Sequence, residues 1–334
     1  MELREVLVTR RMPESGMELI SKEYKVRVWE EDRPIPRDKL LEMAKGVEGI
    51  ACMLTDRIDR AVMESAGPGL KVIATMAVGF DHIEIAEATR RGILVGNTPG
   101  VLTEATADLT WALILSIARR IVEGDKMTRQ GRFNGWGPTL LLGADFSGKT
   151  IGIIGMGRIG FAVAKRAFGF GMKIIYFDPR RLSPEREKEI SARPVSLPDL
   201  LKGADFVCLH CPLGKDSYHL IGGTELGLMK PSAYLINVAR GPVVDEPALV
   251  QALREKRIAG AALDVYEKEP LLSAGLTELG NVVLAPHLGS ASIETRDKMA
   301  IMTAQNLLAG LRGELPPYVV NPEARNAGRK TPPS

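Results

Sequence analysis

The chain has 334 residues, which is enough for two domains with well-packed cores, and its net charge is only +3. A hydrophobic content of 45% and a charged content of 25% are typical of a soluble globular protein. The basic residues form isolated doublets and no tract, which argues against the usual nucleic-acid-binding arm. We therefore expect no nucleic-acid partner.

The chain shows neither a secretory nor a membrane-spanning pattern. Its N-terminus leads directly into a strand-like run and lacks the apolar region of a signal peptide. The most apolar helical stretch, residues 109–118, is too short to cross a bilayer. Cys208 and Cys211 form a C-x-x-C at the end of an expected strand, which favours buried reduced thiols over a redox pair that opens a helix. We expect no membrane partner and a reducing, cytoplasmic location.

The first hundred residues alternate short β-rich runs with helical patterns. This alternation predicts a small doubly wound α/β domain with a parallel sheet, although it contains no glycine fingerprint. The expected strands and helices are, in chain order, strands 4–10 and 24–30, helix 37–45, strands 48–54 and 70–76, helix 83–91 and strand 92–97.

A long helix is expected over residues 103–129, followed by a loop rich in glycine and tryptophan at 131–143. A second α/β series then begins at Thr150. Its expected strands are 150–155, 172–178, 205–211, 233–239, 260–266 and 281–286. A final helix is predicted over 292–311, and the proline-rich tail from Pro316 is expected to be partly disordered.

Two phosphate-binding patterns lie nearly next to each other. Residues 143–150, GADFSGKT, satisfy the P-loop pattern, but a P-loop needs its Lys and Thr to open a helix that faces the phosphates. Lys149 and Thr150 instead lead into an expected strand, so we interpret this match as coincidental. A P-loop NTPase would need nucleotide hydrolysis that depends on Lys149.

Residues 155–160, GMGRIG, fit the dinucleotide fingerprint G-x-G-x-x-G between a strand and a helix. Gly155 permits the tight turn, Gly157 lets backbone approach a pyrophosphate, and Gly160 lets the helix pack on the strand. Asp178 ends the next expected strand, where its carboxylate can accept hydrogen bonds from the adenosine ribose. The alternative is that the glycines serve an ordinary strand-to-helix turn.

The same aspartate bears on the choice of cofactor. Asp178 would repel a 2′-phosphate, which favours NAD. Arg180 and Arg181 follow it closely and leave NADP as the alternative.

Three reactive side chains follow strands of the second series, where ligands bind in an open α/β sheet. Arg240 follows strand 233–239, Glu269 comes soon after strand 260–266, and His287 follows strand 281–286. Taken singly, they can be a surface ion pair, a solvated loop carboxylate and an ordered loop histidine. Taken together, they suit carbonyl reduction, with a histidine proton donor, a carboxylate that stabilises its imidazolium, and a guanidinium that binds a 2-oxo acid.

Backbone after strand 70–76 fits the same chemistry. Gly79, in AVGFD, permits close approach, and successive N–H groups near Val78 can cradle a carboxylate, although an ordinary turn explains the spacing equally well. We expect the other histidines, His82, His210 and His219, to lie at a helix start, a buried strand end and a loop.

The chain resembles the D-isomer-specific 2-hydroxyacid dehydrogenases from about Val6 to Asn321, and most of all their glyoxylate/hydroxypyruvate reductase members. Several matching stretches are specific to that family, so the resemblance does not depend on the glycine fingerprint. They are AVGFDHIEI, NTPGVLTEATADL, GKTIGIIGMGRIG, LHCPL, LINVARGPVVDE, AALDVYEKEP and LAPHLGSAS.

The resemblance implies a NAD(P)H-dependent reductase of small 2-oxo acids such as glyoxylate and hydroxypyruvate. Arg240 would bind substrate, Glu269 would pair with His287, and His287 would be the acid/base. Asp264 would hold the nicotinamide carboxamide, with Thr106 nearby. The full set of implied cofactor contacts is Thr106, Gly155, Gly157, Arg158, Ile159, Gly160, Asp178, Pro179, Arg180, Pro212, Val238, Ala239, Asp264, His287 and Gly289.

The resemblance also implies the remaining substrate contacts, the domain plan and the assembly. Leu54, Val78 and Gly79 would contact substrate, and Trp136 would reach the active site of a partner subunit. A Rossmann nucleotide-binding domain, residues 102–288, would be inserted into a flavodoxin-like substrate domain of residues 1–101 and 289–334. A homodimer is expected, and no metal is expected.

The sequence departs from the family pattern at Pro242, where many relatives have a small residue, and at Gly214, which replaces a common threonine in a cofactor-facing loop. Other dehydrogenases of the family, acting on phosphite or D-3-phosphoglycerate, are the main alternatives. Val78 stands where phosphite enzymes carry lysine, and Glu269 stands where formate enzymes carry glutamine. An NAD-sensing corepressor is the alternative from another class.

Overall fold

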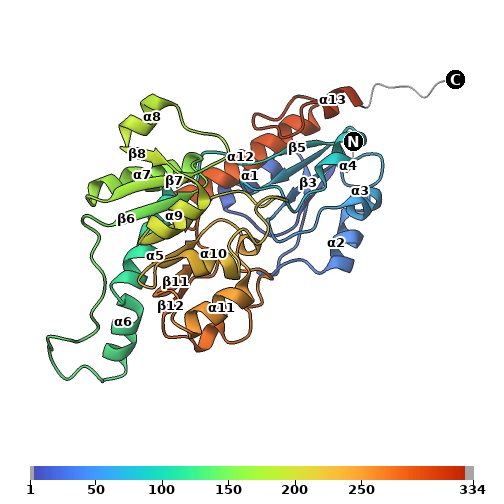
Figure 1. The fold of residues 1–334 in the computed structure, drawn as a ribbon. Helices are drawn as coiled ribbons and strands as arrows, with labels where there is room; N and C mark the ends of the chain where they lie inside the picture. The colour runs from blue at the N-terminus through green and yellow to red at the C-terminus, as the bar shows by residue number, and fades with distance from the viewer. Residues whose placement is uncertain (1–3, 328–334) are drawn as a thin grey trace. The chain divides into compact units, whose positions relative to one another are not determined.

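The computed structural model describes residues 4–327, which form two compact units. Of the described residues, unit 1 contains 4–102 and 291–327, and unit 2 contains 103–290. Every named strand pair in both units is parallel. Two parallel-sheet α/β domains were expected, and this fold class is confirmed (Figure 1).

Unit 1 is built on a five-stranded sheet in the order β2-β1-β3-β4-β5, which is the flavodoxin-like order. Its strands are β1 (Glu5–Val8), β2 (Lys25–Val28), β3 (Gly49–Cys52), β4 (Val72–Thr75) and β5 (Leu94–Gly96). Its helices are α1 (Glu14–Ser21), α2 (Arg37–Ala44), α3 (Arg60–Ala66), α4 (Ile85–Arg90), α12 (Ile293–Leu311) and α13 (Ala324–Ala327).

Alternation along the strands separates the core of unit 1 into two layers. Val6 and Val8 of β1 join the hydrophobic cluster that contains α12, whereas Leu7 joins the cluster on the other face of the sheet. Successive strand residues point to opposite faces, so helices on both sides exclude water from the sheet. Burying each such aliphatic side chain contributes about 1.5–3 kcal/mol.

Unit 2 is built on a seven-stranded sheet in the order β12-β11-β10-β9-β6-β7-β8. Read from β8, the first six strands have the Rossmann order 3-2-1-4-5-6. The strands are β6 (Thr150–Ile154), β7 (Lys173–Phe177), β8 (Ala192–Pro194), β9 (Phe206–Leu209), β10 (Tyr234–Asn237), β11 (Gly260–Leu263) and β12 (Val282–Leu284). The helices are α5 (Thr103–Ala118), α6 (Ile121–Arg129), α7 (Arg158–Gly169), α8 (Pro184–Glu189), α9 (Leu197–Gly203), α10 (Gly223–Leu228) and α11 (Glu246–Arg254).

Helices pack on both faces of this second sheet. Trp111 of α5 joins the hydrophobic cluster that contains Ile151 and Ile153, and its indole N–H donates to the carbonyl oxygen of Val163 in α7 at 3.1 Å. On the other face, Leu200 of α9 joins a separate cluster. Helices therefore shield both faces of the sheet from water, as its continuous apolar strands require.

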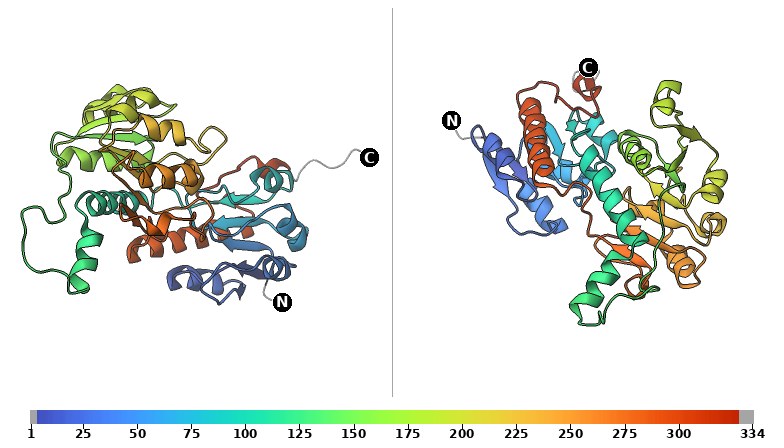
Figure 2. Two further views of the ribbon diagram at one scale, coloured as in Figure 1. Left: turned by 60° about the horizontal axis from the view of Figure 1, so that its bottom comes forward. Right: turned by 90° about the vertical axis from the view of Figure 1, so that its left-hand side faces the viewer.

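The single helix expected over 103–129 is wrong, because α5 ends at Ala118 and α6 begins at Ile121. Arg120 between them adopts a left-handed conformation with φ 53°. The carbonyl oxygen of Ala118 accepts the N–H of Ala144 at 2.9 Å, which takes an acceptor that a continuous helix would use. A returning segment of the chain thus helps to end α5. In all three views α6 and the loop after it lie at an edge of unit 2 (Figures 1 and 2).

The tail from Pro316 was expected to be partly disordered, and for residues 316–327 this is wrong. Val320 donates its N–H to the carbonyl oxygen of Val95 at 2.7 Å, and the fully buried side chain of Asn321 accepts the N–H of Val95. These contacts extend the edge of the five-stranded sheet. The last seven residues lie outside the described part of the chain.

Among residues 4–327, no helix is long and apolar enough to cross a membrane.

Candidate active site

The carboxyl ends of three neighbouring strands bring Arg240, Glu269 and His287 to one edge of the seven-stranded sheet. Arg240 follows β10, Glu269 follows β11, and His287 follows β12. The strands pair in that order and run parallel, so their carboxyl ends lie side by side. The charge of Arg240 acts on the Glu269 carboxyl group and helps to lower its pKa.

His287 and Glu269 form a direct pair. Nδ1 of His287 lies 2.8 Å from Oε2 of Glu269, and the two side chains are 26% and 25% exposed. The other Glu269 oxygen accepts the N–H of Tyr266 at 3.0 Å. Burial alone would raise the pKa of Glu269, but His287, the N–H of Tyr266 and the charge of Arg240 together outweigh it and hold that pKa below its ordinary value. The carboxylate is therefore ionised beside the imidazole.

Asp264 shapes the loop that carries His287. Its side chain is 1% exposed and accepts the N–H groups of Leu288 at 2.6 Å and Gly289 at 2.8 Å, while its own carbonyl oxygen accepts the N–H of His287. His287 adopts the left-handed conformation, with φ 57°. Burial raises the pKa of Asp264, although the hydrogen bond from Leu288 opposes the shift. The carboxylate thus fixes the turn, a role that the sequence did not reveal.

Thr106 of α5 lies beside this turn. A Cβ placed on Gly289 would lie 3.3 Å from Oδ2 of Asp264 and 3.5 Å from Cγ2 of Thr106, so the three residues are neighbours. The cofactor roles of Thr106 and Asp264 stay predictions.

Asn237, which sequence reasoning missed, orders the turn that carries Arg240. Its buried amide donates to the carbonyl oxygen of Arg240 at 3.0 Å and accepts the N–H of Ala239 at 3.0 Å. Arg240 is partly buried, and its Nη1 donates to the carbonyl oxygen of Ala239. The available signal was a polar residue at the end of an otherwise apolar strand. Arg240 is also the N-cap of a short 3-10 helix, Gly241–Val243, so side-chain bonds and this helix hold the turn together.

The glycine fingerprint adopts the geometry that a dinucleotide pyrophosphate requires. Gly155 has φ 94°, and a Cβ there would lie 2.5 Å from the backbone nitrogen of Cys211. A Cβ on Gly160 would lie 2.2 Å from the carbonyl oxygen of Gly155, whereas one on Gly157 would meet nothing within 4 Å. Gly157 is the N-cap of α7 and supplies no side-chain cap, so the first N–H groups of α7 face an open approach. These residues fit a bound dinucleotide.

Asp178 follows β7 and braces this turn. Its Oδ2 accepts the N–H of Met156 at 2.8 Å, and its Oδ1 accepts the N–H of Arg180 at 2.8 Å. Arg181 forms two hydrogen bonds to the carboxylate of Glu187, at 2.8 and 2.9 Å. Arg181 is thus engaged within its own loop.

The other expected cofactor contacts also lie in unit 2. Arg158 and Ile159 open α7, Pro179 follows Asp178, Pro212 follows β9, and Val238 and Ala239 follow β10. All of them lie at the carboxyl ends of neighbouring strands.

Unit 1 places the expected substrate contacts at the end of its own sheet. Leu54 follows β3, and Val78 and Gly79 follow the neighbouring strand β4. The side-chain amide of Asn97 donates to the carbonyl oxygen of Val78 at 2.7 Å, which fixes this peptide. Their contact with substrate stays a prediction.

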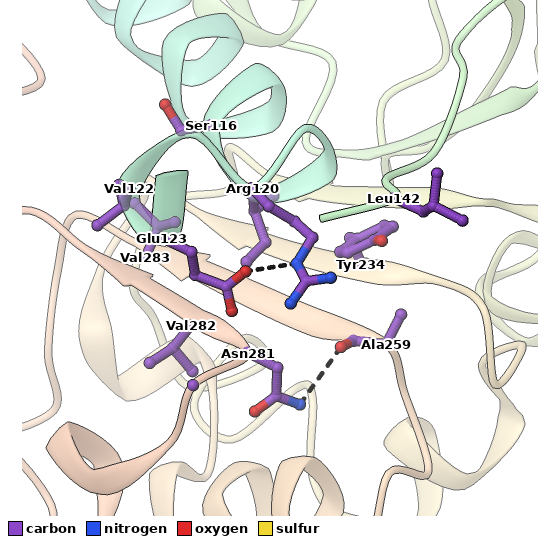
Figure 3. Close-up of a pocket in the computed structure, with 12 residues that line it drawn as sticks. Ser116, Arg120, Val122, Glu123, Leu142, Tyr234, Ala259, Asn281, Val282 and Val283 are labelled. Atoms are coloured by element: carbon purple, nitrogen blue, oxygen red, sulfur yellow. Dashed lines mark hydrogen bonds and ion pairs between the residues drawn. The ribbon is translucent and has the colours of Figure 1, made fainter. Parts of the chain in front are cut away.

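Trp136 lies in the loop after α6 and is 86% exposed. That loop returns along the amino ends of the strands, where Leu142 lines a cavity of about 290 Å³ together with Tyr234, Ala259 and Asn281. Figure 3 shows Arg120 and Glu123 paired at its wall. Ligands of open α/β sheets bind at the opposite, carboxyl ends, so this cavity is separate from the cofactor edge.

The P-loop pattern and the C-x-x-C take the structures expected for coincidental matches. Lys149 and Thr150 lead into β6, so no helix N-terminus follows them. Cys208 is buried in β9, and burial raises its pKa as well as that of Cys211, which rises to about 11. Neither thiol has the lowered pKa of a redox cysteine.

Comparison with known proteins agrees with this geometry. Residues 111–289 match the profile of the family described as "D-isomer specific 2-hydroxyacid dehydrogenase, NAD binding domain". The chain is 53% identical over 320 residues to a glyoxylate reductase from Thermococcus litoralis, covering 95% of this chain and 96% of that one.

Solved structures are similar over nearly the whole chain. The TT0316 protein from Thermus thermophilus has a TM-score of 0.88 and 46% identity, covering 95% of this chain and 99% of that one. An NADPH-dependent glyoxylate/hydroxypyruvate reductase from Sinorhizobium meliloti, solved with NADP and malonate, has a TM-score of 0.84 and 31% identity, covering 97% and 98%. The resemblance read from the motifs is confirmed. The chain belongs to the D-isomer specific 2-hydroxyacid dehydrogenase family, whose members are oxidoreductases that use a nicotinamide dinucleotide.

Proposed function

We propose that this enzyme reduces glyoxylate and closely related 2-oxo acids such as hydroxypyruvate to the 2-hydroxy acids. The observation that carries the proposal is the 2.8 Å pair of His287 and Glu269 beside the strand end that holds Arg240. The names of the similar reductases from Thermococcus litoralis and Sinorhizobium meliloti support this substrate class.

The chain's own residues then have distinct tasks. The guanidinium of Arg240 binds the 2-oxo acid through paired hydrogen bonds. Glu269 holds Nδ1 of His287, which leaves Nε2 to donate a proton to the substrate carbonyl oxygen as that oxygen becomes a hydroxyl. Because Glu269 stays ionised, it stabilises the protonated imidazole before transfer. The bound nicotinamide supplies the hydride.

The cofactor is held along the carboxyl edge of the seven-stranded sheet. Gly157 and the uncapped N-terminus of α7 receive the pyrophosphate, and Asp178 receives the adenosine ribose. The further proposed contacts are Thr106, Gly155, Arg158, Ile159, Gly160, Pro179, Arg180, Pro212, Val238, Ala239, Asp264, His287 and Gly289.

NAD is the proposed physiological cofactor. A carboxylate at Asp178 repels a 2′-phosphate, and the engagement of Arg181 with Glu187 removes one of the two cations that favour NADP. Arg180 keeps NADP as the alternative, and the related Sinorhizobium meliloti reductase is NADPH-dependent.

The substrate carboxylate is proposed to meet the backbone of Val78 and Gly79, with Leu54 beside it.

A second copy of the chain is proposed to pack on α6 and the loop after it and to receive Trp136. The argument is a group of exposed apolar side chains on this segment, which a monomer would leave in water. They are Ile121, Val122, Phe133, Trp136, Leu140 and Leu142. Light scattering should give twice the mass of one chain, and a single-chain mass would contradict the dimer.

Oxidation of NADH and of NADPH, measured with glyoxylate, hydroxypyruvate, pyruvate and 3-phosphohydroxypyruvate offered separately, tests the function. Fast turnover with the first two is expected, and His287→Ala should lose most of kcat while it still binds NADH. A faster rate with a larger oxo acid would change the proposed substrate. Tight NADH binding without turnover of any oxo acid would overturn the enzyme proposal and favour an NAD-sensing protein.

A further inference from the structure

His219 makes two contacts that no catalytic role explains. It lies in the turn between β9 and α10 and adopts the left-handed conformation, with φ 50°. Its N–H donates to the carbonyl oxygen of Pro242 at 2.8 Å, and its ring Nε2 lies 3.1 Å from Oε1 of Glu267. The ring of Tyr218 stacks on it, with 4.1 Å between the ring centroids. A non-glycine residue keeps this backbone conformation when its surroundings hold it there.

The two contacts of His219 reach the two turns that carry catalytic groups. Pro242 comes two residues after Arg240, and Glu267 comes two residues before Glu269. One side chain with its own backbone therefore connects the turn after β10 to the turn after β11.

These two turns also press directly on each other. A Cβ placed on Gly241 would lie 1.8 Å from the carbonyl carbon of Tyr266 and 2.4 Å from the backbone nitrogen of Glu267. Only glycine fits at that distance, so the backbones beside Arg240 and Glu269 are in contact. A change in the separation of the turns alters the position of both catalytic side chains.

His219 also lies among acidic side chains where the two turns meet. Glu267 is 17% exposed, and the 2% exposed Glu246 accepts the N–H of Glu267 at 2.5 Å and the hydroxyl of Ser273 at 2.7 Å. Asp245 lies 4.0 Å from Nδ1 of His219. The other oxygen of Glu267 accepts the backbone N–H of Glu246 at 3.4 Å. The loss of His219 therefore leaves Oε1 of Glu267 without this ring partner.

We propose that His219 is a positioning residue that fastens the turn of Arg240 to the turn of Glu269, so that both groups meet substrate in one geometry. The kinetic part of this inference rests on the proposed reduction of glyoxylate. A misplacement of about 1 Å in such a pair is enough to cost about a hundredfold in rate.

The test compares His219→Ala and His219→Gln with a matched control. Lys230 pairs with Asp205 at 2.9 Å with exposures of 35% and 15%, close to the 31% and 17% of His219 and Glu267, but Asp205 lies before β9, at the other end of the sheet. Lys230→Ala therefore removes a comparable ion pair without touching the catalytic turns.

We expect His219→Ala to lower kcat/KM for glyoxylate by about ten- to hundredfold, to raise KM, and to increase the isotope effect on kcat with deuterated NADH. Glutamine at position 219 should restore most of the activity, because its amide can donate to Glu267. Lys230→Ala should lower the Tm and leave KM and the isotope effect unchanged. A purely structural role would reduce the active fraction and hence kcat alone.

A folded His219→Ala enzyme with wild-type KM, isotope effect and kcat/KM would overturn the proposal. A second measurement does not depend on substrate: the chain has four histidines, so their ring resonances can be assigned, and those of His287 should shift in His219→Ala but not in Lys230→Ala. If the wild type fails to reduce glyoxylate yet these resonances shift, the substrate proposal fails and the positioning role stands. Unshifted resonances would reject the positioning role.

Discussion

Replacing Glu269 with glutamine removes the charge beside His287 while keeping the side-chain length and an oxygen acceptor. Nδ1 and Oε2 are 2.8 Å apart, and an effective dielectric constant of about 20 gives an attraction of about 6 kcal/mol for the ion pair. Both side chains are about a quarter exposed, so solvent screening reduces this value to about 1–3 kcal/mol. We expect Glu269→Gln to lower kcat for reduction by about ten- to hundredfold.

The sign of the pH dependence follows from the lowered pKa of Glu269. Desolvation works against ionisation of this partly buried group, but His287, the N–H of Tyr266 and Arg240 together outweigh it, so the carboxylate stays ionised at lower pH than an ordinary glutamate. A carboxyl group of this kind stabilises the fold above its unfolded pKa of about 4.3, and the contribution is lost as pH falls through the lower folded value. The glutamine variant should therefore be less stable than wild type near pH 7 and approach it in acid.

The assay is NADH oxidation with glyoxylate from about pH 5 to about pH 9, with the cofactor affinity measured by fluorescence. Without the carboxylate no negative charge faces the imidazole, so kcat should be lower than that of the wild type across this pH range. Glu255→Gln is the matched control, because Glu255 pairs with Arg257 at 2.8 Å on the surface and should leave the profile unchanged. A Glu269→Gln enzyme with wild-type kcat across this pH range would refute the reasoning.

Four further substitutions test the cofactor edge and the helix break. Asp178→Ala should reduce the preference for NADH over NADPH by about tenfold, and an unchanged ratio of the two kcat/KM values would contradict the ribose contact. Gly160→Ala should lower the Tm sharply, because its Cβ would lie 2.2 Å from the carbonyl oxygen of Gly155; Gly157→Ala should keep the Tm and weaken NADH binding in a fluorescence titration. Arg120→Gly should raise the free energy of unfolding by up to about 1 kcal/mol, because relief of left-handed strain exceeds the entropy that glycine adds; denaturant unfolding that shows a loss would contradict this.

Much of the fold was readable from the sequence because parallel sheets bury both faces. Continuous apolar runs identified five strands of unit 1 and six of the seven strands of unit 2. The missed strand, β8 (Ala192–Pro194), is three residues long and ends in proline, so it carries little signal. Ligands of open α/β sheets bind at the carboxyl ends of the strands, which led us to select Arg240, Glu269 and His287. The structure places all three at one edge of the sheet.

Other features depend on contacts between distant parts of the chain. The glycine nearest to Arg120 in the chain is Gly124, which lies inside α6 and does not end a helix. The break instead coincides with a hydrogen bond from the returning Ala144 to Ala118. The proline-rich tail is predicted from its sequence to be partly disordered, yet Val320 and Asn321 hydrogen-bond to Val95 at the edge of the sheet of unit 1. Neither contact has a local sequence pattern.

The histidines also differ in whether their role could be predicted from the sequence. His287 was identified because its strand and its charged neighbours are visible in the sequence. The pairing of His219 with Glu267 was missed, because 48 residues separate them and only the turn geometry after β9, β10 and β11 brings them within 3.1 Å. A side chain whose partners come from other turns leaves no spacing to recognise.

The sequence by itself determined the alternation of strands and helices, the dinucleotide fingerprint and the strand ends that carry reactive groups. These properties follow from periodicity and from residues close together in the chain. The tertiary structure alone decided that Asp264 holds the His287 loop, that Asn237 orders the turn of Arg240, and that His219 contacts Pro242 and Glu267. Each of these depends on hydrogen bonds whose partners meet only after the sheet has assembled, because buried polar groups take whichever partners the packed fold supplies.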